Sequence, residues 1–279
     1  MKIAVASGKG GTGKTTLAVA LAQACDEPVC YLDCDVEEPN GHLFLRSTNI
    51  VKQPVSVLIP EVDKDRCTDC GACREICEFN AVVTIAKHAL VFPELCHSCG
   101  GCTAVCPTGA MVEKPVRIGK VSVGESDGFQ TLEGSLDVGQ MMAPPVIRAV
   151  KNAAPPDCLT IIDCPPGTAC PMITAVRGAD FVILVTEPTP FGLNDLTLAV
   201  ETLRGMEIPF GVVINRSNVG DDRVVAYCCN ENISVLLKIQ ESRKIAEAIS
   251  RGDGLLSAKP EMKSVFQKLI QTIQKEVCS

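Results

Sequence analysis

Short apolar runs alternate with longer amphipathic segments along most of this chain. Five runs rich in valine and isoleucine lack the polar alternation of a half-exposed strand, which is typical of parallel strands covered on both faces. Strands that alternate with helices predict an α/β fold, a doubly wound and mostly parallel sheet flanked by helices. The predicted strands are residues 2–6, 29–33, 159–163, 181–186 and 210–214, and the predicted helices are residues 14–25, 139–152, 192–205, 241–250 and 261–276.

Residues 61–114 interrupt this pattern and contain eight of the seventeen cysteines. Two halves, 67–86 and 96–113, repeat one order: a Cys-rich turn, a short helix and a short apolar strand. An internal duplication of this kind predicts a small α+β domain inserted into the larger one. We therefore expect residues 1–60 and 115–279 to form the larger domain and residues 61–114 to form the insert.

Composition narrows the class of protein. The 279 residues are 46% hydrophobic and 21% charged, which is typical of a globular protein. No apolar run reaches the length of a membrane span, and the N-terminus enters a strand directly without a secretory signal, so we expect a cytoplasmic protein without a stable membrane anchor. A net charge of −7 without a basic block disfavours nucleic-acid binding. Cysteines this numerous in a reducing compartment indicate metal or redox chemistry.

A glycine-rich loop follows the first predicted strand and opens the first predicted helix. It fits the phosphate-binding pattern G-x-x-x-x-G-K-[ST] in the required strand–loop–helix context. Backbone N–H groups of such a loop cradle phosphate oxygens, Lys14 would reach the β- and γ-phosphates of ATP, and the Thr15 hydroxyl would hold Mg²⁺. The residues of the predicted ATP site in this loop are Gly8, Lys9, Gly10, Gly11, Thr12, Gly13, Lys14, Thr15 and Thr16.

Lys9, which the loop has in addition to Lys14, is part of a resemblance to a known family. The segment from Lys9 to Thr15 resembles the K-G-G-x-G-K-[ST] loop of the MinD/ParA-type ATPases and of the related nitrogenase iron protein. In that family the first lysine crosses a dimer interface to the nucleotide of the partner. The resemblance implies an ATP-sandwich homodimer, or a dimer with a paired paralogue, in which Lys9 is catalytic together with Lys14.

Further landmarks of the same family follow in order. Asp35 resembles the switch I aspartate that orients the attacking water, whereas Asp33 is the weaker candidate, a strand-end residue near Mg²⁺. Asp163 resembles the Walker B aspartate that supports Mg²⁺ through water, and Pro166 lies in a segment that resembles switch II. Asn215 matches the position that reads adenine.

The cysteines of the insert form two runs with the spacing of bacterial two-cluster ferredoxins. In those proteins the first three cysteines of a run hold one [4Fe–4S] cluster and the fourth cysteine ligates the other. The similarity implies one cluster on Cys67, Cys70, Cys73 and Cys106, and a second on Cys96, Cys99, Cys102 and Cys77. A structural zinc site is the alternative for such cysteines.

The whole chain thus resembles a MinD-superfamily ATPase with an inserted ferredoxin domain. We expect a Mg²⁺-dependent, slow and partner-stimulated ATPase whose dimeric switch couples nucleotide state to electron transfer, or to metallocluster assembly, on an unidentified partner protein. Two alternatives remain: a positioning ATPase with redox-sensing clusters, and an iron–sulfur cluster carrier. Cys170, just after the segment that resembles switch II, is a further thiol that could bind metal across a dimer, with simple packing as its alternative.

Overall fold

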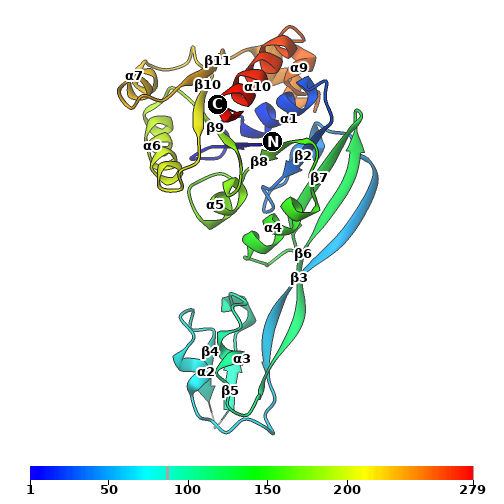
Figure 1. Cartoon of the computed structure of the whole chain (residues 1–279), viewed down its shortest axis with the longest axis vertical. Coiled ribbons are helices and arrows are strands. Elements are labelled where there is room, and N and C mark those ends of the chain that lie inside the picture. Colours follow the sequence, from blue (N-terminus) through cyan, green and yellow to red (C-terminus); the bar gives the residue numbers. More distant parts are fainter. Residues whose placement is uncertain (86–87, 279) are drawn as a thin grey trace.

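A nine-stranded sheet lies at the centre of the larger part of the molecule, the body, in the order β11-β10-β9-β1-β8-β2-β7-β6-β3 (Figure 1). In the computed structural model, which describes residues 1–85 and 88–278, the strands from β11 to β7 are parallel, and β6 pairs antiparallel with both β7 and β3. The strands are β1 (Lys2–Ala6), β2 (Val29–Asp33), β3 (Thr48–Val62), β6 (Met111–Ser126), β7 (Phe129–Leu136), β8 (Leu159–Asp163), β9 (Phe181–Thr186), β10 (Phe210–Asn215) and β11 (Val235–Ile239).

Helices cover both faces of this sheet. One face carries α1 (Lys14–Ala24), α8 (Arg243–Ser250), α9 (Gly254–Ala258) and α10 (Met262–Cys278). The other carries α4 (Ala143–Ala153), α5 (Cys170–Val176), α6 (Pro190–Gly205) and α7 (Arg223–Asn230). Within the described residues, none of these helices combines the length and apolar character needed to cross a bilayer.

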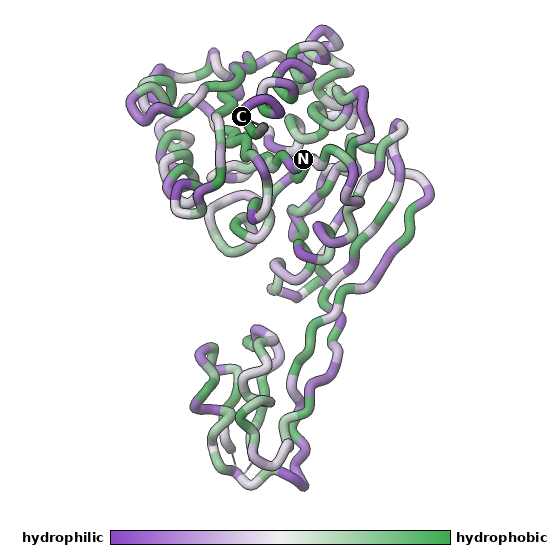
Figure 2. Tube along the Cα trace, viewed as in Figure 1, coloured by the Kyte–Doolittle hydropathy of each residue, from purple (hydrophilic) through white to green (hydrophobic). Residues whose placement is uncertain are grey.

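Each buried strand supplies side chains to two separate hydrophobic layers. In β1, Ile3 and Val5 face α1, whereas Ala4 and Ala6 face the layer of α4 and α5, and all four are fully buried. Figure 2 shows the same concentration of apolar residues in the interior of the body. Because both faces are covered, the strands lose polar alternation, and the predicted mostly parallel α/β sheet is confirmed.

Three predicted helix starts need a correction of two or more residues, and the helix expected over 241–250 begins at Arg243. The helix expected over 139–152 begins at Ala143, because two prolines occupy its first turn, where missing N–H groups are tolerated. The helix expected from residue 192 begins earlier, at Pro190, where the Thr189 hydroxyl accepts a hydrogen bond from Gly192 N.

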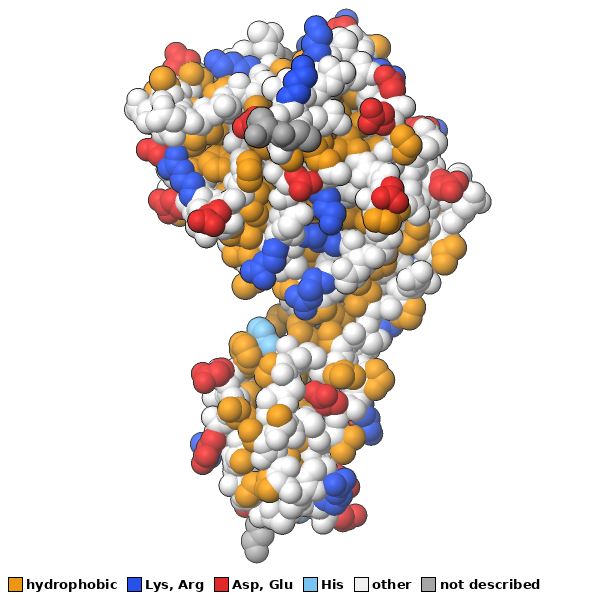
Figure 3. Space-filling model, viewed as in Figure 1, with side chains coloured by type: hydrophobic (Ala, Val, Ile, Leu, Met, Phe, Trp, Pro, Cys, Tyr) orange, Lys and Arg blue, Asp and Glu red, His pale blue; other side chains and the backbone are white. Residues whose placement is uncertain are grey.

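Strands β3 and β6 continue beyond the sheet as a two-stranded ribbon that carries a small lobe (Figures 1 and 3). The lobe has its own small core, which includes Val82, Ala89 and Met111. In the first half of the repeat a helix precedes β4, and in the second half a helix precedes the start of β6; residue 86, the predicted end of the first half, lies outside the described residues. The lobe contains α2 (Ala72–Glu75), β4 (Val82–Ile85), β5 (His88–Val91), the 3₁₀ turn η2 (Pro93–Leu95) and α3 (Gly101–Ala104).

The side chain of Lys151 joins α4 to the end of α5. Its Nζ donates hydrogen bonds to the carbonyl oxygens of Thr174, Ala175 and Arg177 at 3.0, 2.7 and 2.6 Å. Burial lowers the pKa of Lys151, so the ammonium depends on these acceptors. We expect Lys151→Met to lower the free energy of unfolding by about 2 kcal/mol, because hydrogen bonds from a charged donor are lost and the carbonyls stay uncapped. Urea unfolding monitored by circular dichroism measures this, and Lys268→Met, at an exposed position of α10, should cost much less.

Candidate functional site

The loop between β1 and α1 passes so close to its neighbours that two of its glycines cannot be replaced without movement. A side chain on Gly8 would collide with the backbone of Asp195, and one on Gly13 would collide with the Asn215 amide. Gly13 also has a φ of 89°, which favours glycine. The close approaches and the φ of Gly13 thus favour glycine at both positions, as expected for a phosphate-binding loop at the start of α1.

Lys14 lies between two carboxylates at the ends of the central strands. Its Nζ is 2.8 Å from Asp163 Oδ1 and 3.8 Å from Asp35 Oδ2. Burial acts to lower the pKa of Lys14, but the two carboxylates raise it above its usual value, so the ammonium stays charged. Tyr31 donates its hydroxyl to Asp163 Oδ2 at 3.2 Å, and Asp163 is fully buried. The predicted residues Lys14, Asp35 and Asp163 are thus neighbours in space.

Asp33 holds the segment that follows β2. Its Oδ2 accepts the backbone N–H groups of Asn40 and Gly41 at 3.1 and 2.8 Å, and its Oδ1 accepts that of Asp35 at 3.1 Å. Burial and the nearby Asp163 raise the pKa of Asp33 well above its usual range. Asp33 therefore shapes the loop that carries Asp35.

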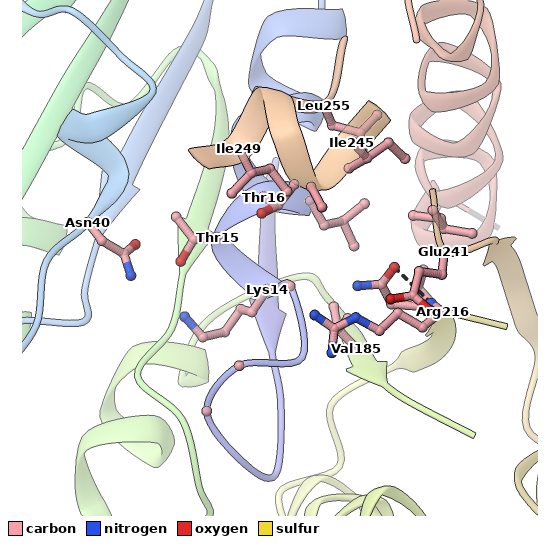
Figure 4. A pocket seen from close by; sticks show the side chains of 18 of the residues that line it. Lys14, Thr15, Thr16, Asn40, Val185, Arg216, Glu241, Ile245, Ile249 and Leu255 are labelled. Carbon is pink, nitrogen blue, oxygen red and sulfur yellow. Dashed lines mark hydrogen bonds between the residues drawn. The ribbon is translucent and has the colours of Figure 1, made fainter. Parts of the chain in front are cut away.

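A cavity of about 510 Å³ opens beside the phosphate loop (Figure 4). Lys14, Thr15 and Thr16 lie at one part of it, and Figure 4 shows Ile245, Ile249 and Leu255 on the helices above. A polar part that suits phosphates thus adjoins an apolar part that suits a flat ring. The wall is completed by Asp35, Glu38, Asn40, Pro166, Asn215, Arg216, Gln240, Glu241 and Ser242.

Two buried polar atoms at this site have no hydrogen-bond partner among the described residues. They are Thr12 Oγ1 in the phosphate loop and Asn40 Oδ1 in the cavity wall. Buried hydroxyl and amide oxygens are normally paired, so these two indicate that a polar ligand completes the site. The donor set therefore fits a nucleotide with Mg²⁺.

Of the other predicted residues, Asn215 lines this cavity, whereas Lys9 and Cys170 are not among its lining residues. Lys9 is one-third exposed, with its Nζ 3.7 Å from Glu187 Oε2. Asn215 donates its side-chain amide to Thr12 O at 2.8 Å, so it supports the phosphate loop in this structure, and adenine recognition stays a prediction. Cys170 is the exposed first residue of α5.

Sequence patterns missed the part of the cavity formed by α8 and α9. Arg216 and Glu241 follow the ends of the neighbouring parallel strands β10 and β11, and Ile245 and Leu255 come from the helices α8 and α9. No local motif marks these residues, since their place depends on the order β9-β10-β11 in the sheet. The rule that ligands lie beyond the carboxyl ends of parallel strands could have indicated them.

Asp35 should make the stability of the ligand-free protein depend on pH. Burial raises the pKa of Asp35 from 3.8 to about 6, although Lys14 acts to lower it. The folded state then binds a proton more tightly than the unfolded state, so stability falls as pH rises from 3.8 to about 6. Relative to Asp35→Asn, we expect a loss of about 3 kcal/mol over this window, measured by urea unfolding without Mg²⁺. Parallel pH profiles of the two proteins would contradict this.

The eight cysteines of the lobe surround two separate small hollows of about 20 Å³ each. Gly71 and Gly100 take up left-handed φ angles of 78° and 75° at matching positions, immediately before α2 and α3. The first hollow is lined by Cys67, Cys70, Cys73 and Cys106, and the second by Cys77, Cys96, Cys99 and Cys102.

Backbone N–H groups point at three of these sulfurs. Ala81 N donates to Cys77 Sγ at 3.3 Å, Ala110 N to Cys106 Sγ at 3.2 Å, and Ser98 N to Cys96 Sγ at 3.4 Å. At Cys106, burial acts to raise the pKa of the thiol, but hydrogen bonds from backbone N–H groups and from the Thr108 hydroxyl lower it below its usual value. Within the described part of the chain, no three Cys, His, Asp or Glu side chains converge on a point suited to a single metal ion.

Known proteins similar to this chain agree with the geometry of the phosphate loop. The sequence profile of the CobQ/CobB/MinD/ParA nucleotide-binding domain matches residues 3–256. An uncharacterized protein of Methanocaldococcus jannaschii, MJ0578, is 30% identical over 280 residues, 98% of each chain.

Two further similarities are more distant. An iron–sulfur cluster carrier protein of Pyrococcus furiosus is 27% identical over 230 residues, which are 76% of this chain and 60% of the carrier. The solved structure of the cell division ATPase MinD from Pyrococcus furiosus shares the fold, with a TM-score of 0.59 at 22% identity over 98% of each chain. On this profile match and on its phosphate loop, the chain belongs to the CobQ/CobB/MinD/ParA family of nucleotide-binding proteins.

Proposed function

We propose that this protein is an ATP-hydrolysing dimeric switch whose inserted domain, residues 61–114, carries two [4Fe–4S] clusters. The switch would couple nucleotide state to electron transfer, or to metallocluster assembly, on a partner protein in the cytoplasm. The observation that carries the proposal is that one pair of strands, β3 and β6, belongs both to the sheet of the nucleotide site and to the lobe of the cysteines.

The residues of the body suit ATP hydrolysis. Lys14 would neutralise charge on the β- and γ-phosphates, and the Thr15 hydroxyl and Asp163 would hold Mg²⁺, Asp163 through water. Asp35, 3.8 Å from Lys14 Nζ, would orient the attacking water. Such positioning and charge stabilisation are most of what phosphoryl transfer requires from a protein. Lys9 stays partly exposed beside Glu187, so the Lys9 ammonium could reach the nucleotide bound to a second copy of the chain.

The two hollows suit iron–sulfur clusters better than zinc. Each cubane cluster takes four thiolates, one at each iron, so its cysteines surround a volume and do not meet at a point. The lobe has this arrangement, because four cysteines line each hollow. Among the described residues, these cysteines do not form a site for a single metal ion. The bound clusters would supply low-potential electron transfer, which N–H groups aimed at the sulfurs would tune.

The second hollow is joined to the ribbon by hydrogen bonds of Ser98. Ser98, between Cys96 and Cys99, accepts a hydrogen bond from Leu58 N at 3.1 Å and donates one to Leu58 O at 2.7 Å. Cys96 packs against the core layer that contains Ile59. A displacement of strand β3 would therefore also move Ser98 and the cysteines on either side of it.

One experiment tests the coupling. ATP turnover of the anaerobic protein is measured with the clusters oxidised, reduced by dithionite, or removed by chelation. We expect turnover to change by roughly tenfold between the states, a coupling of ordinary size. Equal turnover in all three states would contradict the proposal, and Cys229→Ala, an exposed cysteine outside the lobe, should behave as the unaltered protein.

A cluster carrier is a second candidate, which the similarity to the Pyrococcus furiosus carrier protein favours. Cluster delivery to an iron-free acceptor protein separates the two functions, because an electron-transfer switch would reduce a dye but retain its iron. If delivery occurs, Cys170→Ala tests whether this exposed thiol takes part.

A further inference from the structure

A second hollow of the body lies over the edge of the sheet, away from the phosphate loop. It has a volume of about 240 Å³ and is formed on β7, β6 and β3. Alternation places Thr131 and Glu133 on this face, whereas Leu132 points to the opposite layer, where α4 packs. The turn η1 (Gly41–Leu43) and the residues after it cover the hollow. The hollow is therefore formed by the fold and not by a loose surface loop.

Two lysines from neighbouring strands line this hollow. Lys52 pairs with Ser122 and Lys120 pairs with Pro54 across β3 and β6, so both side chains lie on one face. In the part of the chain that the structure describes, neither ammonium has an acidic partner. Asp33 and Glu133 line the same hollow, but Asp33 accepts backbone N–H groups and Glu133 contacts His42, so the two lysines together still favour an anion.

The remaining polar groups of the hollow are paired with one another. Glu133 Oε2 is 2.8 Å from His42 Nδ1, and the hydroxyls of Ser47 and Thr131 are 2.8 Å apart. Glu133 is thus paired with His42, and Asp33, the other carboxylate of the hollow, is paired with backbone N–H groups of Asn40 and Gly41. Among the described residues, the two lysine ammonium groups have no such ion-pair partner. Ile50, which is 51% exposed, adds an apolar surface. This combination suits an oxyanion attached to a small apolar body.

The hollow shares a wall with the nucleotide cavity. Asp33, Gly41 and His42 line the hollow, whereas Asp35 and Asn40 of the same segment line the nucleotide cavity. Tyr31 also lines the hollow, and its hydroxyl donates to Asp163, which holds Lys14. A ligand on one side would thus order residues that both sites use.

We propose that this hollow binds a small organic oxyanion, a carboxylate or a phosphate monoester, and that its occupancy strengthens nucleotide binding through the segment 33–42. The inference does not depend on hydrolysis or on the clusters, so it can fail while the proposed function stands. Lys52 and Lys120 supply the positive charge that the anion requires. The segment 33–42 connects the hollow to the nucleotide cavity.

The test uses the full chain saturated with ADP and Mg²⁺, which blocks the phosphate loop to the added anions. Butyrate, succinate and methyl phosphate are each titrated and followed by calorimetry. We expect at least one to bind saturably, and Lys52→Met and Lys120→Met each to weaken it by about tenfold, the value of one charged hydrogen bond. Lys268→Met, an equally simple change on α10, should leave binding unchanged.

A second measurement tests the link. The dissociation constant of ADP is determined with and without the binding anion, and we expect it to fall by about fivefold. No saturable binding, or binding that survives both lysine substitutions, would overturn the site. An ADP constant that is unchanged or raised, or a fall that persists in Lys52→Met, would overturn the link.

Discussion

Lys14→Met is expected to lower the rate of ATP hydrolysis by about a hundredfold or more, the effect of removing one preorganised donor to a developing charge. The ammonium is buried between Asp163 and Asp35, at the start of α1. Methionine fills a similar volume but brings no charge to the phosphates. Phosphate release at saturating ATP and Mg²⁺ measures the effect.

The same substitution has a second, separable consequence. Without Lys14, the fully buried Asp163 keeps only the Tyr31 hydroxyl among the side-chain partners seen here, and the pKa of Asp35 should rise further because Lys14 no longer lowers it. Circular dichroism must therefore show that the variant is folded. Lys268→Met is the matched control. A folded Lys14→Met protein that hydrolyses ATP at the unaltered rate would contradict the assigned role.

Removal of one cysteine from either hollow is expected to cost about half of the iron. Two [4Fe–4S] clusters hold about eight irons per chain, so Cys70→Ala and Cys99→Ala should each leave about four, and the double variant almost none. Both cysteines are exposed, so substitution should disturb packing little. Iron and sulfide analysis of anaerobically purified protein measures the loss.

Cys229→Ala is the control for these variants, since Cys229 is also exposed but lies on α7. Full iron in both lobe variants would contradict the clusters, and so would stoichiometric zinc in the unaltered protein. Equal losses in the two variants would also support the division of the eight cysteines into the sets that line the two hollows.

The parallel core was predictable because each of its strands is buried on both faces. The predicted strands 2–6, 29–33 and 181–186 match β1, β2 and β9 residue for residue. The phosphate loop was predictable because its chemistry requires adjacent residues. The limits of the buried strands and of the phosphate loop both depend on residues that are adjacent in the sequence.

The edge of the sheet and the ribbon were not predicted. Residues 48–62 and 111–126 carry prolines, lysines and exposed apolar residues, because on the ribbon neither face is fully covered. A pattern rule that expects burial on one or both faces fails there. The hollow beside Lys52 and Lys120 was missed for the same reason, since it exists only once β3 and β6 are paired.

The ribbon also bears on how the two parts of the molecule could be separated. Val62 and Met111 pair directly, so the polypeptide leaves for the lobe and comes back at adjacent points. A short reverse turn could join these positions and excise every ferredoxin-like cysteine without altering the connectivity of the nine strands. Removal of the lobe at this point would therefore leave the strand order of the body unchanged.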